Sequence, residues 1–283
     1  MKINKLVFLL ALLLFCAALS ATIFDNTHPS AKAVGMGGSF VSLNGGAESV
    51  FYNPAGILGT EKWGLFLSYK KPFSLDFINE SIGAVSYDLG KMGVVAFGYN
   101  GMSVGLDGDT LTSEQTLILS YANSFYSDRS ATFNAGFSVK YLGLMFKDYG
   151  SASNFSIDLG IMAKVGKNTY LGFSLQDFNS PEFGKDITER IPVKMNFGVA
   201  YEPYYGTKTL IEIEKNEFEP ARIHAGAEFG IMEYLILRAG IGTNPTVMNA
   251  GLTVKYSIVG IDYAFEYHNT LGITHHFGFT LNY

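Results

Sequence analysis

The stretch IPVKMNFGVAYE, residues 191–202, decides the fold class, because bulky apolar side chains alternate along it with small or polar ones. The first set of alternate positions holds Ile191, Val193, Met195, Phe197, Val199 and Tyr201. Successive side chains of a strand point to opposite faces. The stretch therefore predicts a strand with one apolar face and one face of polar or small residues.

The same alternation recurs through residues 63–283 and predicts about fourteen strands. The predicted spans are 63–70, 81–88, 92–99, 114–124, 131–146, 154–165, 169–178, 191–202, 207–216, 220–229, 234–242, 247–257, 260–268 and 273–283. Strands of roughly 10 residues in even number are typical of bacterial transmembrane barrels. We therefore predict an all-β fold, a transmembrane antiparallel β-barrel spanning residues 63–283.

Composition agrees with a membrane barrel. Hydrophobic residues make up 48% of the chain and charged residues 16%, against about 25% charged in a soluble domain. After residue 21, no stretch approaches the roughly 18–20 consecutive apolar residues of a spanning helix. The longer predicted connections, 71–80, 100–113, 147–153 and 179–190, share one end of the barrel and are expected outside the cell. Both termini are then expected in the periplasm.

Two sets of strand residues are candidate functional groups. Inward-facing charges are predicted to form a lumen polar network of Lys194, Glu212, Glu214, Arg222, His224, Arg238, Lys255, Asp262 and Glu266. Charges facing lipid are costly, so these should face inward and pair, Glu214 with Arg222 and Lys255 with Asp262. Such a network either fills and stiffens the lumen or lines a polar path.

The last strand ends the chain in an aromatic residue. Its outward positions hold Phe277, Phe279, Leu281 and Tyr283. This pattern looks like the signal by which the outer-membrane barrel assembly machinery recognises its clients, and that machinery and outer-membrane lipid are predicted partners. The alternative is an ordinary last strand of a soluble β-protein.

Residues 1–21 read as a signal peptide, with Lys2 and Lys5 before the apolar run Leu6–Phe15 and small residues near position 20. The expected location is therefore the bacterial outer membrane. A short membrane anchor is an alternative, and a lipoprotein signal is disfavoured because bulky Phe15 precedes Cys16. Cys16 is the only cysteine, which excludes an intrachain disulfide and a multi-cysteine metal site.

Residues 22–62 are rich in Gly, Ser, Ala and Asn and show no sustained alternation. Gly35-Met36-Gly37-Gly38 and Tyr52-Asn53-Pro54-Ala55-Gly56 stand out within them. Here the chain resembles the PorV/PorQ-like group, which is similar to the FadL-type long-chain fatty-acid transporters. The resemblance implies an N-terminal hatch segment that plugs a fourteen-stranded barrel. The implied hatch motif is Gly35, Gly37, Gly38, Asn53, Pro54 and Ala55.

Motifs for catalysis are missing from the sequence, which contains no HExxH, GxSxG or P-loop pattern. No enzyme activity, cofactor or metal site is predicted, and a net charge of -5 argues against a nucleic-acid partner. The resemblance favours uptake or passage of small hydrophobic or amphipathic molecules across the outer membrane. The alternative is a PorV-like accessory or shuttle protein of type IX secretion with a secreted protein as cargo.

Overall fold

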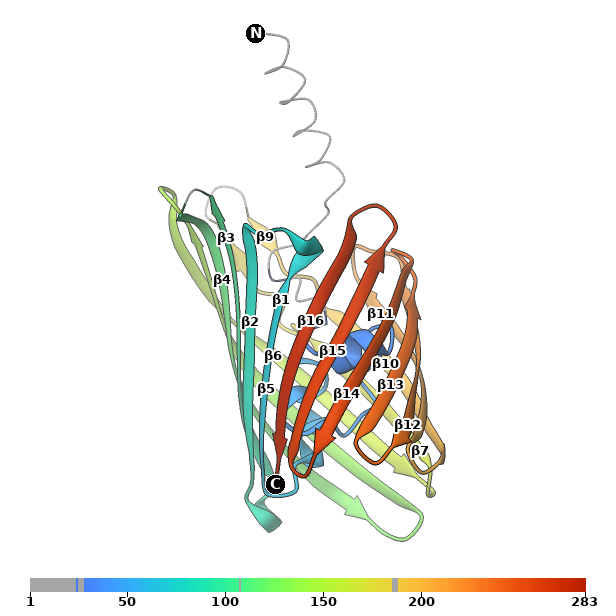
Figure 1. The fold of residues 1–283 in the computed structure, drawn as a ribbon. Helices are drawn as coiled ribbons and strands as arrows, with labels where there is room; N and C mark the ends of the chain where they lie inside the picture. The colour runs from blue at the N-terminus through green and yellow to red at the C-terminus, as the bar shows by residue number, and fades with distance from the viewer. Residues whose placement is uncertain (1–23, 25–27, 107, 185–187) are drawn as a thin grey trace.

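The chain forms a closed barrel of fourteen antiparallel strands in a computed structural model that describes residues 24, 28–106, 108–184 and 188–283 (Figure 1). The barrel strands are β1 (Trp63–Lys71), β2 (Ile78–Asp88), β3 (Val94–Leu106), β4 (Asp109–Ser127), β5 (Ala131–Phe146), β6 (Gly150–Val165), β7 (Thr169–Gln176), β10 (Lys194–Tyr204), β11 (Thr207–Asn216), β12 (Arg222–Met232), β13 (Leu235–Gly242), β14 (Val247–Tyr256), β15 (Val259–His268) and β16 (Gly272–Asn282). The predicted barrel and its strand number are confirmed. The predicted signal peptide lies outside the described residues.

Each barrel strand has an apolar outer face and a polar or small inner face. In β6, Ile157, Leu159 and Ile161 are exposed on the outside, whereas Ser156 and Asp158 are buried inside. Strands neighbouring in sequence pair with each other, except that β7 pairs with β10, and β1 pairs with β16 to close the barrel. The period-two pattern therefore sorts side chains between the membrane-facing surface and the lumen.

Several predicted strand boundaries were wrong by three residues or more. Residues 100–113 are mostly strand, since β3 runs to Leu106 and β4 begins at Asp109, and β6 begins at Gly150 rather than at 154. These extensions are rich in Ser, Thr and Gly and lack the apolar alternation that marks a lipid-facing strand. Ile191 was predicted to face outward, but it precedes β10 and is buried with Phe24, Leu142, Leu144 and Phe183.

The two ends of the barrel differ in their connections. At one end, which we call the turn end, strands join through residues 89–93, 128–130, 166–168, 205–206, 233–234 and 257–258. Trp63 and the C-terminus also lie at the turn end, at the bottom of Figure 1. The other end, the loop end, carries residues 177–184 and 188–193, which include the small hairpin β8 (Glu182–Phe183) and β9 (Glu189–Arg190).

The seam between β1 and β16 is secured at the turn end. Gly64 pairs with Asn282 at one end of this ladder and Lys71 with His275 at the other. The Trp63 and Tyr283 backbones exchange two hydrogen bonds of 3.0 Å, and their rings stack with centroids 6.2 Å apart. The proposed assembly residues Phe277, Phe279, Leu281 and Tyr283 alternate with buried positions and thus face outward. Their role in assembly stays a prediction.

A charge on this outward face should impair membrane insertion. Phe279 is opposite Leu67 in the middle of the seam, so we expect Phe279→Arg to cost about 2–4 kcal/mol, as arginine does at the bilayer midplane. The measurement is the amount of heat-modifiable barrel in the outer-membrane fraction. Asn282→Arg, at the exposed rim of the same strand, is the control. Normal levels of the Phe279→Arg protein would contradict the lipid-facing assignment.

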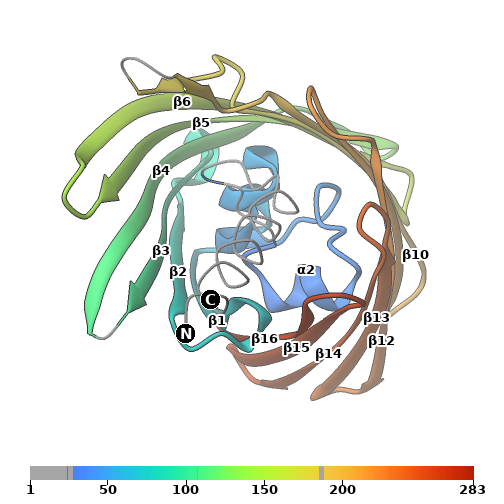
Figure 2. The same ribbon diagram turned by 90° about the horizontal axis from the view of Figure 1, so that it is seen from above.

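Residues 28–62, which we call the lumen segment, lie inside the barrel (Figure 2). The segment contains the helix α2 (Ala31–Gly35) and the 3₁₀ helices η1 (Gly46–Phe51) and η2 (Pro54–Gly59). Helix α2 packs on β13–β16, η1 on β1–β3, and η2 on β3–β6. Among the described residues, no helix is long and apolar enough to cross a membrane.

Candidate functional site

Asn53 links two parts of the lumen segment to the barrel wall. It is the N-cap of η2, and its side-chain oxygen accepts a hydrogen bond from Ala55 N at 3.1 Å. Its amide nitrogen donates to Val41 O at 2.8 Å and to Ile161 O of β6 at 3.2 Å. Pro54 at the first helical position fits this N-terminus, since a proline there loses no helical hydrogen bond. The predicted motif Asn53, Pro54 and Ala55 is thus fully buried against the wall.

The glycines of the predicted motif permit a tight turn after α2. Gly37 and Gly38 have φ values of 71° and 95°, the left-handed region that favours glycine. A Cβ atom on Gly37 would lie 2.5 Å from Ile241 O of β13, so only glycine fits here. Gly35, in the last turn of α2, would place a Cβ 3.1 Å from the Arg238 Cβ. The turn therefore brings the segment's backbone onto the wall.

The wall itself is thinned by glycines where the lumen segment touches it. A Cβ on Gly172 would lie 2.1 Å from Val41 O, and one on Gly240 would lie 2.1 Å from Gly37 N. We call the inward-facing glycines in such contact the glycine belt. Its members are Gly98, Gly136, Gly160, Gly172, Gly198, Gly226 and Gly240, on β3, β5, β6, β7, β10, β12 and β13. The lumen can thus hold a folded segment in direct backbone contact.

Side chains of the wall also bind the segment's backbone. The carboxylate of Glu212 accepts hydrogen bonds from Phe40 N at 2.7 Å and Val41 N at 2.9 Å. The amide of Gln176 donates to Phe51 O at 2.9 Å and Tyr52 O at 3.1 Å. Nδ1 of His224 lies 2.6 Å from Gly37 O. Because these contacts lie inside the lumen, each bond satisfies a backbone group that has little access to water.

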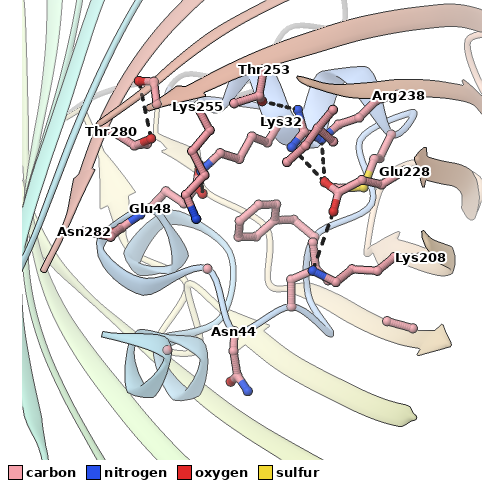
Figure 3. A pocket seen from close by; sticks show the side chains of 18 of the residues that line it. Lys32, Asn44, Glu48, Lys208, Glu228, Arg238, Thr253, Lys255, Thr280 and Asn282 are labelled. Carbon is pink, nitrogen blue, oxygen red and sulfur yellow. Dashed lines mark hydrogen bonds and ion pairs between the residues drawn. The ribbon is translucent and has the colours of Figure 1, made fainter. Parts of the chain in front are cut away.

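A cavity of about 800 Å³ opens between the lumen segment and the wall at the turn end (Figure 3). Met36, Phe40 and Leu43 of the segment line it, together with Ser257 and Ile258 of the β14–β15 turn. Charged side chains surround these apolar residues. They are Lys32, Glu48, Glu61, Glu202, Lys208, Glu228, Arg238 and Lys255. The lining therefore offers both apolar and charged surfaces to a guest molecule.

Several of these charges are paired across the cavity wall. Arg238 lies 2.7 Å from Glu228, which also lies 3.5 Å from Lys208. Within the segment, Lys32 pairs with Glu48 at 2.8 Å. Lys255 is exposed and points into the cavity (Figure 3). Such pairing lets charged side chains line the cavity without leaving isolated buried ions.

Burial and these neighbours set the protonation of the lumen segment. Burial alone would lower the pKa of Lys32, but the Glu48 and Asp262 carboxylates outweigh it and raise that pKa above its usual value. Burial raises the pKa of the Tyr52 phenol well above its usual value. Burial, and then the nearby His224, lowers the pKa of His28. At neutral pH, Lys32 is therefore charged, whereas Tyr52 and His28 are neutral.

The predicted lumen polar network is divided by the lumen segment. Toward the loop end, Glu214 lies 3.3 Å from Arg222, as predicted, and Glu212 and His224 bind the segment. Lys194 lines a small cavity beside them. Toward the turn end, Asp262 lies 3.9 Å from Arg238 and accepts a hydrogen bond from Thr253. Glu266 belongs to neither group, and its carboxylate accepts a hydrogen bond from the Asn249 amide at 3.3 Å.

The predicted pairing of Lys255 with Asp262 is wrong. Asp262 is opposite Thr253, and Lys255 is opposite Gly260. The cause is the β14–β15 turn, which occupies residues 257–258, one residue earlier than the predicted boundary. A shift of one turn residue displaces every cross-strand pair of a hairpin.

Two buried ion groups of the first half of the barrel were not predicted. Lys70 lies 3.0 Å from Glu80, and Lys140 lies 2.8 Å from Asp158 and 2.6 Å from Asp177. The Lys70–Glu80 pair could have been predicted, because opposite charges occupy inward positions of the neighbouring strands β1 and β2. Asp177 belongs to a connection, so alternation does not reveal its place. Among the described residues, no group of three His, Cys, Asp or Glu could hold a metal ion.

Solved structures with a similar fold include two toluene transporters and a FadL homologue. The Ralstonia pickettii toluene transporter TbuX matches with a TM-score of 0.63 and 12% identity over 92% of this chain and 100% of that one. The Pseudomonas putida toluene transporter TodX matches with a TM-score of 0.59 and 12% identity, over 92% of this chain and 98% of that one. A Pseudomonas aeruginosa FadL homologue matches with a TM-score of 0.56 and 11% identity, over 90% of this chain and 95% of that one.

No protein-family model matches the sequence. No curated protein matches it either. The similarity to solved structures at this level of identity shows the barrel fold.

Proposed function

We propose that the chain resides in a bacterial outer membrane and passes small hydrophobic or amphipathic molecules through a plugged barrel. The observation that carries this proposal is the folded lumen segment, which occupies the barrel and contacts the wall through the glycine belt. If the lumen only had to be filled, inward-facing side chains of the wall could fill it without a separate segment. A separate segment can move while the wall stays closed.

The substrate class is inferred from the turn-end cavity. Its apolar residues suit a hydrocarbon portion, and its paired charges suit a polar group. A volume of about 800 Å³ lies in the usual range for small-molecule sites. The fold neighbours TbuX and TodX, described as toluene transporters, support a small hydrophobic substrate.

Orientation follows from the connections. Barrels of bacterial outer membranes have short periplasmic turns and longer external loops. The turn end would then face the periplasm, and the loop end would face outward. The turn-end cavity would be the last compartment before release. The accessory role in type IX secretion stays a hypothesis that rests on the sequence resemblance alone.

The plug is tested by removing it. We expect proteoliposomes with the intact protein to be nearly closed to small sugars in a swelling assay, and deletion of residues 30–56 to open them. The wall ladder does not include these residues, so the deleted protein should still insert. Toluene uptake into the same vesicles should exceed that of protein-free vesicles. An inserted deletion variant that stays equally closed would refute the plug.

A further inference from the structure

Two cavities lie on opposite sides of the lumen segment and share one stretch of wall. The larger is the turn-end cavity, and the smaller, of about 30 Å³, is lined by Lys194, Gln176 and Glu214 toward the loop end. On β10, Asn196 lines the small cavity and Ala200 lines the large one. Only the inward position of Gly198 lies between these two residues along the strand.

The partition between the two cavities is a pair of aromatic side chains. Phe40 lines the large cavity, and Tyr52 lines the small one. Their ring centroids are 4.5 Å apart, with the planes inclined at 31°. Tyr52 is held by the 2.9 Å hydrogen bond that its hydroxyl accepts from Ser30 N. Phe40 packs in the same cluster as Ala200 and Leu210 of the wall.

The backbone at Phe40 and Val41 is held against the wall, whereas the Phe40 ring projects away from these anchors into the cluster with Tyr52. Helix α2 packs on β13–β16, and η2 packs on β3–β6. Between these two docked parts, the Glu212 carboxylate receives the amides of Phe40 and Val41. Val41 O also receives the Asn53 amide. Movement of the Phe40 side chain would join the cavities without undocking either helix.

We propose that Phe40 and Tyr52 form a gate, and that molecules cross the plug between these two rings. This inference rests on the proposed transport function. The route is short, because Asn196 and Ala200 are separated by two inward steps of one strand. Glu212 is a positioning residue for the gate, since it holds the Phe40 backbone while the ring is free to turn.

The test measures access from one cavity to the other. Asn196→Cys places a thiol in the small cavity, and Cys16, in the predicted signal peptide, is the only other cysteine. A membrane-impermeant thiol reagent is added at the periplasmic face of proteoliposomes in which the barrel has a single orientation. We expect Phe40→Ala to raise the labelling rate about tenfold or more, because local openings set such rates.

Ile57→Ala is the matched control. Ile57 is as fully buried as Phe40, but it packs on the other side of the segment with Phe66 and lines neither cavity. Labelling of Asn196→Cys should therefore stay slow in the Ile57→Ala protein. Equal acceleration by both substitutions would mean that the whole segment moves, and no acceleration by Phe40→Ala would mean that the route lies elsewhere. Either result overturns the gate.

The deletion of residues 30–56 separates this failure from failure of the proposed function. If the deletion opens the barrel but Phe40→Ala does not speed labelling, the plug stands and the gate is refuted. If the deletion leaves the barrel closed, the plug is refuted, and the gate is refuted with it.

Discussion

Replacing Gly172 with leucine should dislodge the lumen segment and open the barrel. A Cβ at this position would lie 2.1 Å from Val41 O and 2.5 Å from Val41 C, which are backbone atoms that cannot rotate away. Overpacking a well-packed core typically costs about 1–3 kcal/mol, and leucine extends well beyond the Cβ. The wall is fixed by ladders on both sides, so the segment should yield. Solute permeation of proteoliposomes measures the opening, and limited proteolysis of residues 28–62 measures the release.

Gly143→Leu provides the control on the opposite face. Gly143 alternates with the buried Leu142 and Leu144 of β5 and so faces outward, where a Cβ meets nothing nearer than 3.4 Å. The same leucine there should leave the barrel closed. A Gly172→Leu protein that inserts and stays closed, with the segment still protected, would show that the segment does not need this contact.

The glycine belt also shows what sequence patterns can and cannot reveal. Alternation was enough to predict the barrel, its fourteen strands and the inward positions, because exposure to lipid dictates side-chain polarity at every second residue. Gly160 and Gly198 were visible on the predicted inner faces of their strands. The unused signal was that glycine recurs at inward positions on neighbouring strands. A recurrence of that kind indicates close approach of another backbone.

The anchors of the lumen segment could not be predicted in the same way. Glu212 was assigned to a charged network, yet it binds backbone amides of Phe40 and Val41, about 170 residues earlier in the chain. Gln176 lay at the end of a predicted strand and had no distinguishing pattern. Such contacts depend on how the segment is threaded through the lumen. Alternation along single strands carries no information about that path.

Cysteine labelling of the lumen depends on where the segment covers the wall. Inward orientation alone predicts that cysteines at Glu212 and His224 react readily with polar reagents. Both are instead buried beneath the segment, with relative exposures of 5% and 4%. Inward orientation therefore does not imply access to water in this barrel, and slow labelling there would not argue against the strand assignment.

Removing the Lys140 side-chain charge should strongly destabilise the barrel. Its ammonium lies 2.8 Å from Asp158 and 2.6 Å from Asp177, and the Asp177 backbone N also donates to Asp158 at 2.9 Å. Lys140→Met would leave the buried Asp158 carboxylate facing the partly buried Asp177 carboxylate with no cation between them. Breaking a buried ion pair from one side costs about 3–5 kcal/mol. The midpoint of urea unfolding in detergent micelles should fall accordingly, and residues 177–193 should become more sensitive to protease.

Two comparison proteins distinguish charge imbalance from lost packing. Adding Asp158→Asn and Asp177→Asn to Lys140→Met removes the stranded charges, so it should recover much of the lost stability. Lys71→Met breaks an exposed pair with Asp76, also 2.8 Å long, and should change stability by no more than about 1 kcal/mol. If Lys140→Met were as mild as Lys71→Met, water would have to reach Asp158 in the native barrel. The 2% exposure of Asp158 argues against such access.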